Sequence, residues 1–389
     1  MERSENKTYG FGTIIKNLKS NIRSYTMIIA LLVIWCILAI LTEGIFFMPR
    51  NLSMLVRQTA GTAVMALGML RVSVTGNIDL SGGSTMGLLG GIAACCQVWY
   101  ELPVVPTVLI VIFFGIVIGA WHGLLIAYLK IPAFIATLGS HLALRGVLLG
   151  LTKSVTIAPM SDAFKNIGQG YVVSWLGWTI AIVFSLIALY AIIKDRQSKV
   201  KYGFVVPNWG VTLLKCAGIV AIIMAFMVIM SNYRGEPIPV LILLGLAVLV
   251  AFLTTKTRFG RSVYAIGCNQ EAADLSGINT RKVIFYVYII EGIMCGISGI
   301  ILTARLNAGA SSAGQNAEMD AIASCVIGGA SLSGGLGSVL GAVIGALIMT
   351  SLDNGMSLLN TENFWQYIVK GMILVAAVYI DIITKKKSA

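Results

Sequence analysis

The residues whose types and spacing best fit a defined role lie in a hydrophilic stretch, 258–279, between long apolar segments. Asn269 is a favourable N-cap, Glu271 places a carboxylate at the positive end of a helix dipole, and Gly277 can adopt the left-handed conformation that ends a helix. The stretch therefore predicts a helix of about eight residues, which is marginal in isolation because nucleation is costly. Such a helix persists when something docks on it.

The docking chemistry of this short helix is divided between polar and apolar side chains. Hydrogen bonds and charge are offered by Asn269, Gln270, Glu271, Asp274 and Ser276, and a small apolar face for a groove by Ala272, Ala273 and Leu275. The alternative is a solvated surface helix without a partner. The capping and polarity favour docking on a soluble partner.

Ionisable residues elsewhere do not form a catalytic or metal-binding pattern. Asp79 and Asp320 start apolar segments, where carboxylates can accept hydrogen bonds from free backbone N–H groups. His122 and His141 are too far apart for a helical metal pair, and we predict no catalytic residue and no metal site. Six charged residues lie within or at the ends of apolar runs: Arg57, Arg71, Arg145, Glu291, Asp353 and Lys370. Charge is expensive there, so such side chains face an interface, the protein interior or water.

A glycine-rich motif occurs twice, at 78–84 and 330–336. In the topology predicted below, both copies precede a helix of the same direction, which indicates two halves related in parallel with a translocation path at their interface. Chance recurrence of glycine-rich turns is the alternative. Small residues at such positions let helix backbones approach closely. The candidates for lining the path are Asn77, Asp79, Ser81 and Ser84.

The elements that position these residues are transmembrane helices. The chain has 389 residues, of which 57% are hydrophobic and 11% charged, whereas soluble domains carry about 25% charged residues. The apolar runs are continuous and about 20 residues long, which favours helices over a β-barrel. We therefore predict an all-α polytopic membrane protein with 10–12 transmembrane helices. The twelve apolar segments are 25–47, 54–75, 83–100, 104–129, 132–152, 176–193, 215–231, 238–255, 284–304, 319–333, 336–358 and 365–383.

The net charge of +12 is distributed as expected for a membrane protein rather than a nucleic-acid-binding one. Nineteen of the 28 Lys and Arg residues fall on one side of the predicted topology, which places both termini in the cytoplasm. The predicted organisation is a tail at 1–24, a single transmembrane domain at 25–383 with a cytoplasmic loop at 256–283, and a basic tail at 384–389. A helical hairpin at 176–231 is interpreted as an insertion.

Seven motifs, in order and at similar spacing, resemble the permease subunits of bacterial ABC importers for monosaccharides, the ribose/galactose/xylose group. Asn77 departs from the glycine that many members have. The hairpin at 176–231 makes the xylose branch the most similar. The motifs are 75–84, 131–139, 145–146, 259–267 with 269–279, 318–323, 326–335 and 365–371.

The resemblance implies a non-catalytic permease that imports a monosaccharide by alternating access across the inner membrane. It implies a cytoplasmic ATPase with two nucleotide-binding halves, an extracytoplasmic sugar-binding protein and a second permease copy, with 269–277 as the helix that couples to the ATPase. The chain has no phosphate-binding loop, so ATP and Mg are expected on the partner, and no nucleic acid is expected. The competing classes are an ion-coupled secondary sugar transporter and a membrane scaffold or receptor.

Overall fold

A computed structural model describes residues 22–204, 206 and 208–386, and these residues are mainly helical. The chain divides into two compact units. The smaller comprises Tyr171–Glu236 with Met1–Thr26, and the larger comprises Met27–Gly170 and Pro237–Ala389. The predicted tail at 1–24 lies almost entirely outside the described residues, as do the last three residues of the predicted tail at 384–389.

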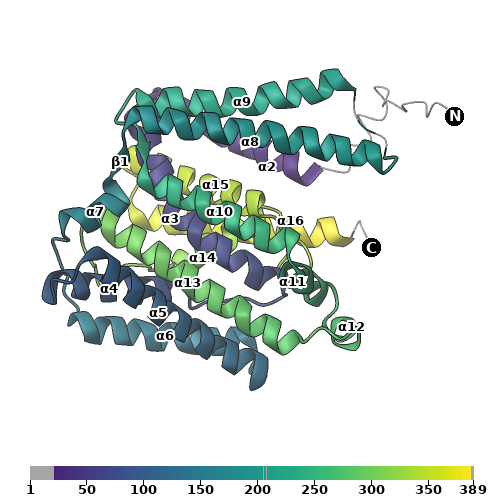
Figure 1. Cartoon of the computed structure of the whole chain (residues 1–389). Coiled ribbons are helices and arrows are strands. Elements are labelled where there is room, and N and C mark those ends of the chain that lie inside the picture. Colours follow the sequence, from purple (N-terminus) through teal and green to yellow (C-terminus); the bar gives the residue numbers. More distant parts are fainter. Residues whose placement is uncertain (1–21, 205, 207, 387–389) are drawn as a thin grey trace. The chain divides into compact units, whose positions relative to one another are not determined.

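The larger unit contains most of the helices (Figure 1). The first helix, α2 (Ile22–Leu41), starts in the smaller unit and ends in the larger one. Short 3-10 or π segments lie at Ile45–Phe47, Cys95–Trp99 and Leu124–Tyr128. The other helices are α3 (Pro49–Val74), α4 (Gly82–Ala94), α5 (Val104–Gly123), α6 (Ala133–Thr152), α7 (Asp162–Gln169), α10 (Ile238–Lys256), α11 (Arg258–Cys268), α12 (Gln270–Leu275), α13 (Thr280–Leu306), α14 (Ala317–Ile327), α15 (Val339–Leu358) and α16 (Asn363–Lys386).

The smaller unit is an insertion of two long helices, α8 (Ser174–Lys201) and α9 (Trp209–Ser231). At the basic end of α8, the Arg196 guanidinium lies over the Trp209 ring, 4.2 Å from its centroid, and donates a 2.7 Å hydrogen bond to Thr212. These contacts join the end of α8 to the start of α9. The two-residue strands β1 (Tyr171–Val172) and β2 (Glu236–Pro237) pair where the insertion begins and ends.

Every predicted apolar segment overlaps one helix, which confirms the all-α membrane fold. Seven helices of the described residues are long and apolar enough to cross a membrane: α5 with its π extension, α6, α8, α9, α10, α13 and α15. Several boundaries differ from the prediction, and two of these differences have a clear cause. Helix α3 begins earlier, because Pro49 suits the first helical position, and α14 ends at Ile327, before two glycines, so it has only 11 residues.

The core of the larger unit is built on glycine contacts around α13, which packs against α3, α4 and α5. The backbones of α5 and α13 meet at Gly115 and Gly292. A Cβ at Gly292 would lie 2.1 Å from the Gly115 carbonyl oxygen, and one at Gly115 would lie 2.6 Å from that of Gly292. Glycines four residues further along each helix, Gly119 and Gly296, complete the small-xxx-small pattern of close helix pairs.

The two other helices of this core, α14 and α15, meet in the same way. Gly341 lies against the Gly328 carbonyl and Gly345 against that of Ser324, so both glycines allow the close approach that the sequence predicts. The second glycine-rich motif also adjoins the end of α3, shortly before the first motif. The Gly335 amide donates a 2.9 Å hydrogen bond to the carbonyl of Val74, at the end of α3.

Candidate functional site

A polar cavity of about 300 Å³ lies between α3, α13, α14, α15 and α16. The cavity lies near the end of α13, at Arg305, whereas α12 lies just before the start of that helix, with residues 276–279 between them. Because α13 has 27 residues, the cavity and α12 are separated by about 40 Å along its axis. We call it the outer cavity. Its polar lining consists of Gln58, Thr62, Arg305, Gln315, Asp320, Thr350, Asp353, Ser357 and Gln366.

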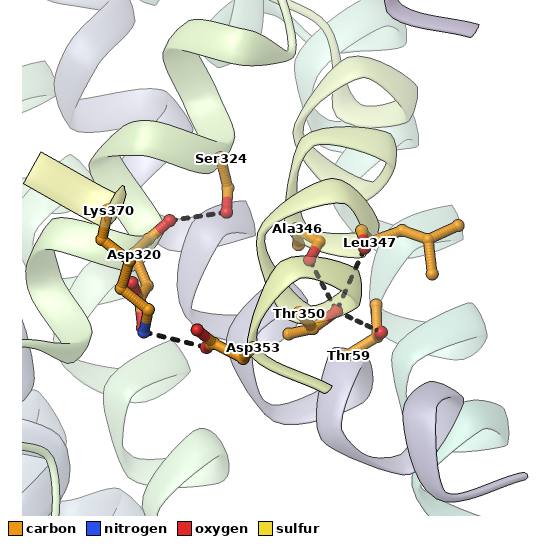
Figure 2. A network of polar contacts seen from close by, with 8 residues as sticks. All are labelled: Thr59, Asp320, Ser324, Ala346, Leu347, Thr350, Asp353 and Lys370. Atoms are coloured by element: carbon orange, nitrogen blue, oxygen red, sulfur yellow. Dashed lines mark hydrogen bonds and ion pairs between the residues drawn. The ribbon is translucent and has the colours of Figure 1, made fainter. Parts of the chain in front are cut away.

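Two carboxylates that line the outer cavity, Asp320 and Asp353, belong to a charged triad with Lys370 (Figure 2). The Lys370 ammonium bridges two carboxylates, at 2.9 Å from Asp320 and 2.8 Å from Asp353. These side chains are 19–28% exposed, so they are partly screened by water. Asp320 was expected to satisfy backbone N–H groups at a helix start. The structure corrects this interpretation, because its carboxylate pairs with Lys370 and Asp353 joins the same cation.

The rest of the lining can recognise a neutral, hydroxyl-bearing ligand. The amides of Gln58, Gln315 and Gln366 both donate and accept hydrogen bonds, and the Arg305 guanidinium donates. Sequence reasoning missed these residues. One signal was available in the sequence. Gln58 and Thr62 are polar residues four positions apart in an apolar helix, and residues at this spacing share a helix face.

The outer cavity continues into a smaller lobe of about 50 Å³. The deep end of this lobe is lined by Met65, Met86 and Ser298. The Ser298 hydroxyl donates to the Met86 sulfur at 3.0 Å and to the Gly61 carbonyl at 2.8 Å. Flexible thioether side chains therefore end the cavity inside the bundle.

The short helix α12 has the predicted caps. The Asn269 side chain accepts a 2.9 Å hydrogen bond from the Ala272 amide, and Gly277 adopts a φ of +86°. The predicted apolar face needs correction, because Ala273 is buried whereas Leu275 is 90% exposed. Ala273 therefore anchors α12 to the bundle, and Leu275 is the apolar residue offered to a partner.

An unpredicted helix, α11, precedes α12. Its side chains Val263 and Ile266 are buried, and Thr257 caps its start. The Tyr264 hydroxyl donates a 2.7 Å hydrogen bond to the Gly337 carbonyl, and burial raises the pKa of this phenol. Its apolar run is only four residues long, at 263–266, which is why hydropathy alone does not reveal it.

A second cavity, of about 370 Å³, lies beside α12. Its polar lining includes Asn77, Lys130, Gln270, Asp274 and Arg281. We call it the inner cavity. It brings one predicted path residue, Asn77, together with two residues of the predicted coupling segment.

The other predicted path residues are buried. The Asp79 carboxylate accepts hydrogen bonds from the amide and hydroxyl of Ser81, at 2.7 and 2.6 Å. The Ser84 hydroxyl lies 3.2 Å from Nδ1 of His141. Asp79 and Ser81 thus hold the turn before α4, Ser84 links α4 to α6, and the role of all three in a path stays a prediction.

Comparisons with known proteins define the class of this chain. The model of a family described as the branched-chain amino acid transport system / permease component matches residues 51–378. The chain belongs to this family of transport permeases. No solved structure is a significant match.

Among characterised relatives, the chain is 48% identical to the xylose transport system permease protein of Haemophilus influenzae, over 95% of this chain and 99% of the relative. It is 45% identical to the xylose transport system permease protein of Escherichia coli, over 95% of each. The ribose import permease protein of Escherichia coli is 34% identical, over 91% of this chain and 92% of the relative.

Proposed function

We propose that this chain is the membrane permease subunit of an ATP-driven importer that carries xylose into the cytoplasm. The similarity to two xylose permeases along nearly the whole chain supports this substrate. The observation that carries the proposal is the outer cavity, where amides, a guanidinium and two ion-paired carboxylates surround a volume suited to a small ligand. Sugar hydroxyls can satisfy these donors and acceptors.

The outer cavity receives the sugar from an extracytoplasmic binding protein, and α12 couples to a cytoplasmic ATPase with two nucleotide-binding halves, which holds ATP and Mg. A second permease copy completes the assembly in the inner membrane, with both termini in the cytoplasm. The exposure of Leu275 beside the polar residues Gln270 and Glu271 supports docking of α12 in a groove of the ATPase.

The first experiment measures labelled-xylose uptake in cells that lack the native chain and carry the wild type, Leu275→Asp or Glu271→Arg. The same proteins are purified in mild detergent to identify what accompanies them. Both variants are expected to lose most of the uptake and the associated ATPase while remaining folded, because they change exposed residues only. A substitution of a partly exposed residue outside α12, Lys165→Met, is the control.

Two outcomes contradict the proposal. Uptake that survives ATP depletion but collapses with an uncoupler would establish an ion-coupled carrier. Wild-type uptake and ATPase recovery in both α12 variants would reject the coupling role. Ala273→Arg is unsuitable for this test, because the buried side chain supports α12 itself.

A further inference from the structure

A cluster of buried ionisable side chains lies between the outer and inner cavities and has no role in the mechanism so far. Arg71, Asp79, Tyr288 and Glu291 are each at most 2% exposed. The charges of Arg71 and Asp79 both act on Glu291, and Tyr288 interacts with Asp79 and Glu291. Three segments distant in sequence, α3, the turn before α4 and α13, therefore converge in this cluster.

Most polar atoms of this cluster have no partner in the structure. All three guanidinium nitrogens of Arg71, the hydroxyl of Tyr288 and Oε2 of Glu291 lack a hydrogen bond. Leaving such a group buried and unsatisfied costs about 1–3 kcal/mol, and more when it is charged. The cluster thus presents donors and acceptors that a ligand can satisfy.

The Glu291 carboxylate packs against glycines of α3 and α4. A Cβ at Gly68 of α3 would lie 2.0 Å from Oε2, and a Cβ at Gly82 of α4 would lie 3.5 Å from Oε1. Glycine at position 68 is therefore needed to give the carboxylate its space, whereas the contact at Gly82 is of ordinary length. The carboxylate lies beside the first residue of α4, where the helix dipole favours negative charge.

Methionine side chains lie on the route from the outer cavity toward this cluster. Met65 lines the smaller lobe, and its Cε lies 2.7 Å from the position of a Cβ at Gly82. Met86 lines the same lobe and the outer cavity itself. Along α3 the cavity residues Gln58, Thr62 and Met65 lead directly to Gly68, at intervals of four, three and three residues.

We propose that Arg71, Asp79, Tyr288 and Glu291 form an inner sugar-binding site, closed in this structure, which the outer cavity reaches when Met65 and Met86 move apart. The ligand is a neutral polyhydroxylated molecule, because the cluster combines a cationic donor, two carboxylate acceptors and a phenol that does both. This inference rests on the proposed function. Asn77, at the inner cavity, follows Arg71 along the chain and lies on the cytoplasmic side of the site.

A native cysteine reports on this site. The Cys295 thiol is one turn from Glu291 and donates to its Oε1 at 3.5 Å. Cys325 is equally buried, but its thiol donates to the Ala66 carbonyl at 3.3 Å, in the contact between α14 and α3. A chain that keeps only Cys295 and a chain that keeps only Cys325 therefore form a matched pair.

The experiment measures modification of each single-cysteine permease by a small water-soluble methanethiosulfonate, in the complex purified with its ATPase and supplied with the binding protein. During ATP hydrolysis, Cys295 is expected to react about tenfold faster than at rest, as its accessible state becomes populated. Xylose should slow the reaction, and Cys325 should stay unreactive.

Xylose uptake is measured on the same two proteins, so that the outcomes separate. Cys295 that stays unreactive while uptake continues overturns the inner site and leaves the proposed function standing. Reaction of Cys295 that xylose does not slow shows a hydrated passage without a sugar site and also overturns the proposal. Equal reaction rates of Cys295 and Cys325 would show that the whole helix bundle becomes accessible, and this result also overturns the proposal. Absence of ATP-driven uptake in the wild type rejects the proposed function, and the inner site with it.

Discussion

At the scale of single residues, the Lys370 ammonium is the group on which the charge balance of the outer cavity depends. Lys370→Met would leave the carboxylates of Asp320 and Asp353 partly buried and facing each other without their cation. Because both are partly exposed, we expect a loss of about 1–2 kcal/mol rather than the larger cost of a fully buried pair. Xylose uptake should fall strongly as well, because the cavity would change from nearly neutral to acidic.

The effect of Lys370→Met is measured by detergent unfolding and labelled-xylose uptake, with Lys165→Met as the control. Lys165 also pairs with an aspartate, Asp162, but that pair is exposed and should contribute little. Adding Asp353→Asn to Lys370→Met should recover part of the stability. Equal behaviour of Lys370→Met and Lys165→Met would show that the triad has no special role.

Glu236 gives a prediction about pH. Its side chain is buried, its Oε2 lacks a hydrogen bond, and burial raises the pKa of this carboxyl above its ordinary value of 4.5. Between the unfolded and folded pKa values, the folded state binds more protons, so stability falls as pH rises through that window. Glu236→Gln should therefore raise the melting temperature at pH 7 but not at pH 4. A lower melting temperature for Glu236→Gln at pH 7 would show that the charged form is stabilised instead.

At the scale of elements, α3 and α15 are joined by polar contacts within an apolar surface. Asn51 and Asn354 exchange two amide hydrogen bonds of 2.9 and 3.0 Å, and the hydroxyls of Thr59 and Thr350 lie 2.6 Å apart. Asn354→Leu should cost about 0.6–2 kcal/mol, because interhelical hydrogen bonds in membranes have this magnitude. Detergent unfolding of Asn354→Leu, Asn51→Leu and the double variant measures the coupling, which should be positive. Additive effects would mean that the amides do not support each other.

The elements themselves were largely predictable, whereas the outer cavity was not. Continuous apolar runs predict the positions of the long helices, and the caps Asn269 and Gly277 predict α12. The cavity needs Gln58, Asp320, Asp353 and Lys370 on four different helices, and no local pattern reports which polar helix faces meet. The contact between α5 and α13 was within reach, because Gly115 and Gly119 repeat at the spacing of close helix pairs.

At the scale of the whole molecule, the chain divides into the larger unit and the insertion of α8 and α9. The three buried hydrophobic clusters contain residues of the larger unit only. The two ends of the insertion are adjacent, because the Ile238 amide donates a 3.0 Å hydrogen bond to the Gly170 carbonyl. Loop closure across so short a gap costs little entropy. A short glycine linker can therefore replace residues 171–237.

We expect the chain without 171–237 to insert into membranes and to retain xylose uptake. Its melting temperature should lie within a few degrees of that of the full chain. The reason is that the outer cavity, α12 and the glycine contacts of α13 all lie in the larger unit. The control carries the same linker after Gly170 and keeps the insertion. Loss of uptake in the deletion alone, with the fold intact, would assign the insertion a part in transport or assembly. Loss of the fold would show that α8 and α9 stabilise the bundle despite contributing nothing to its buried clusters.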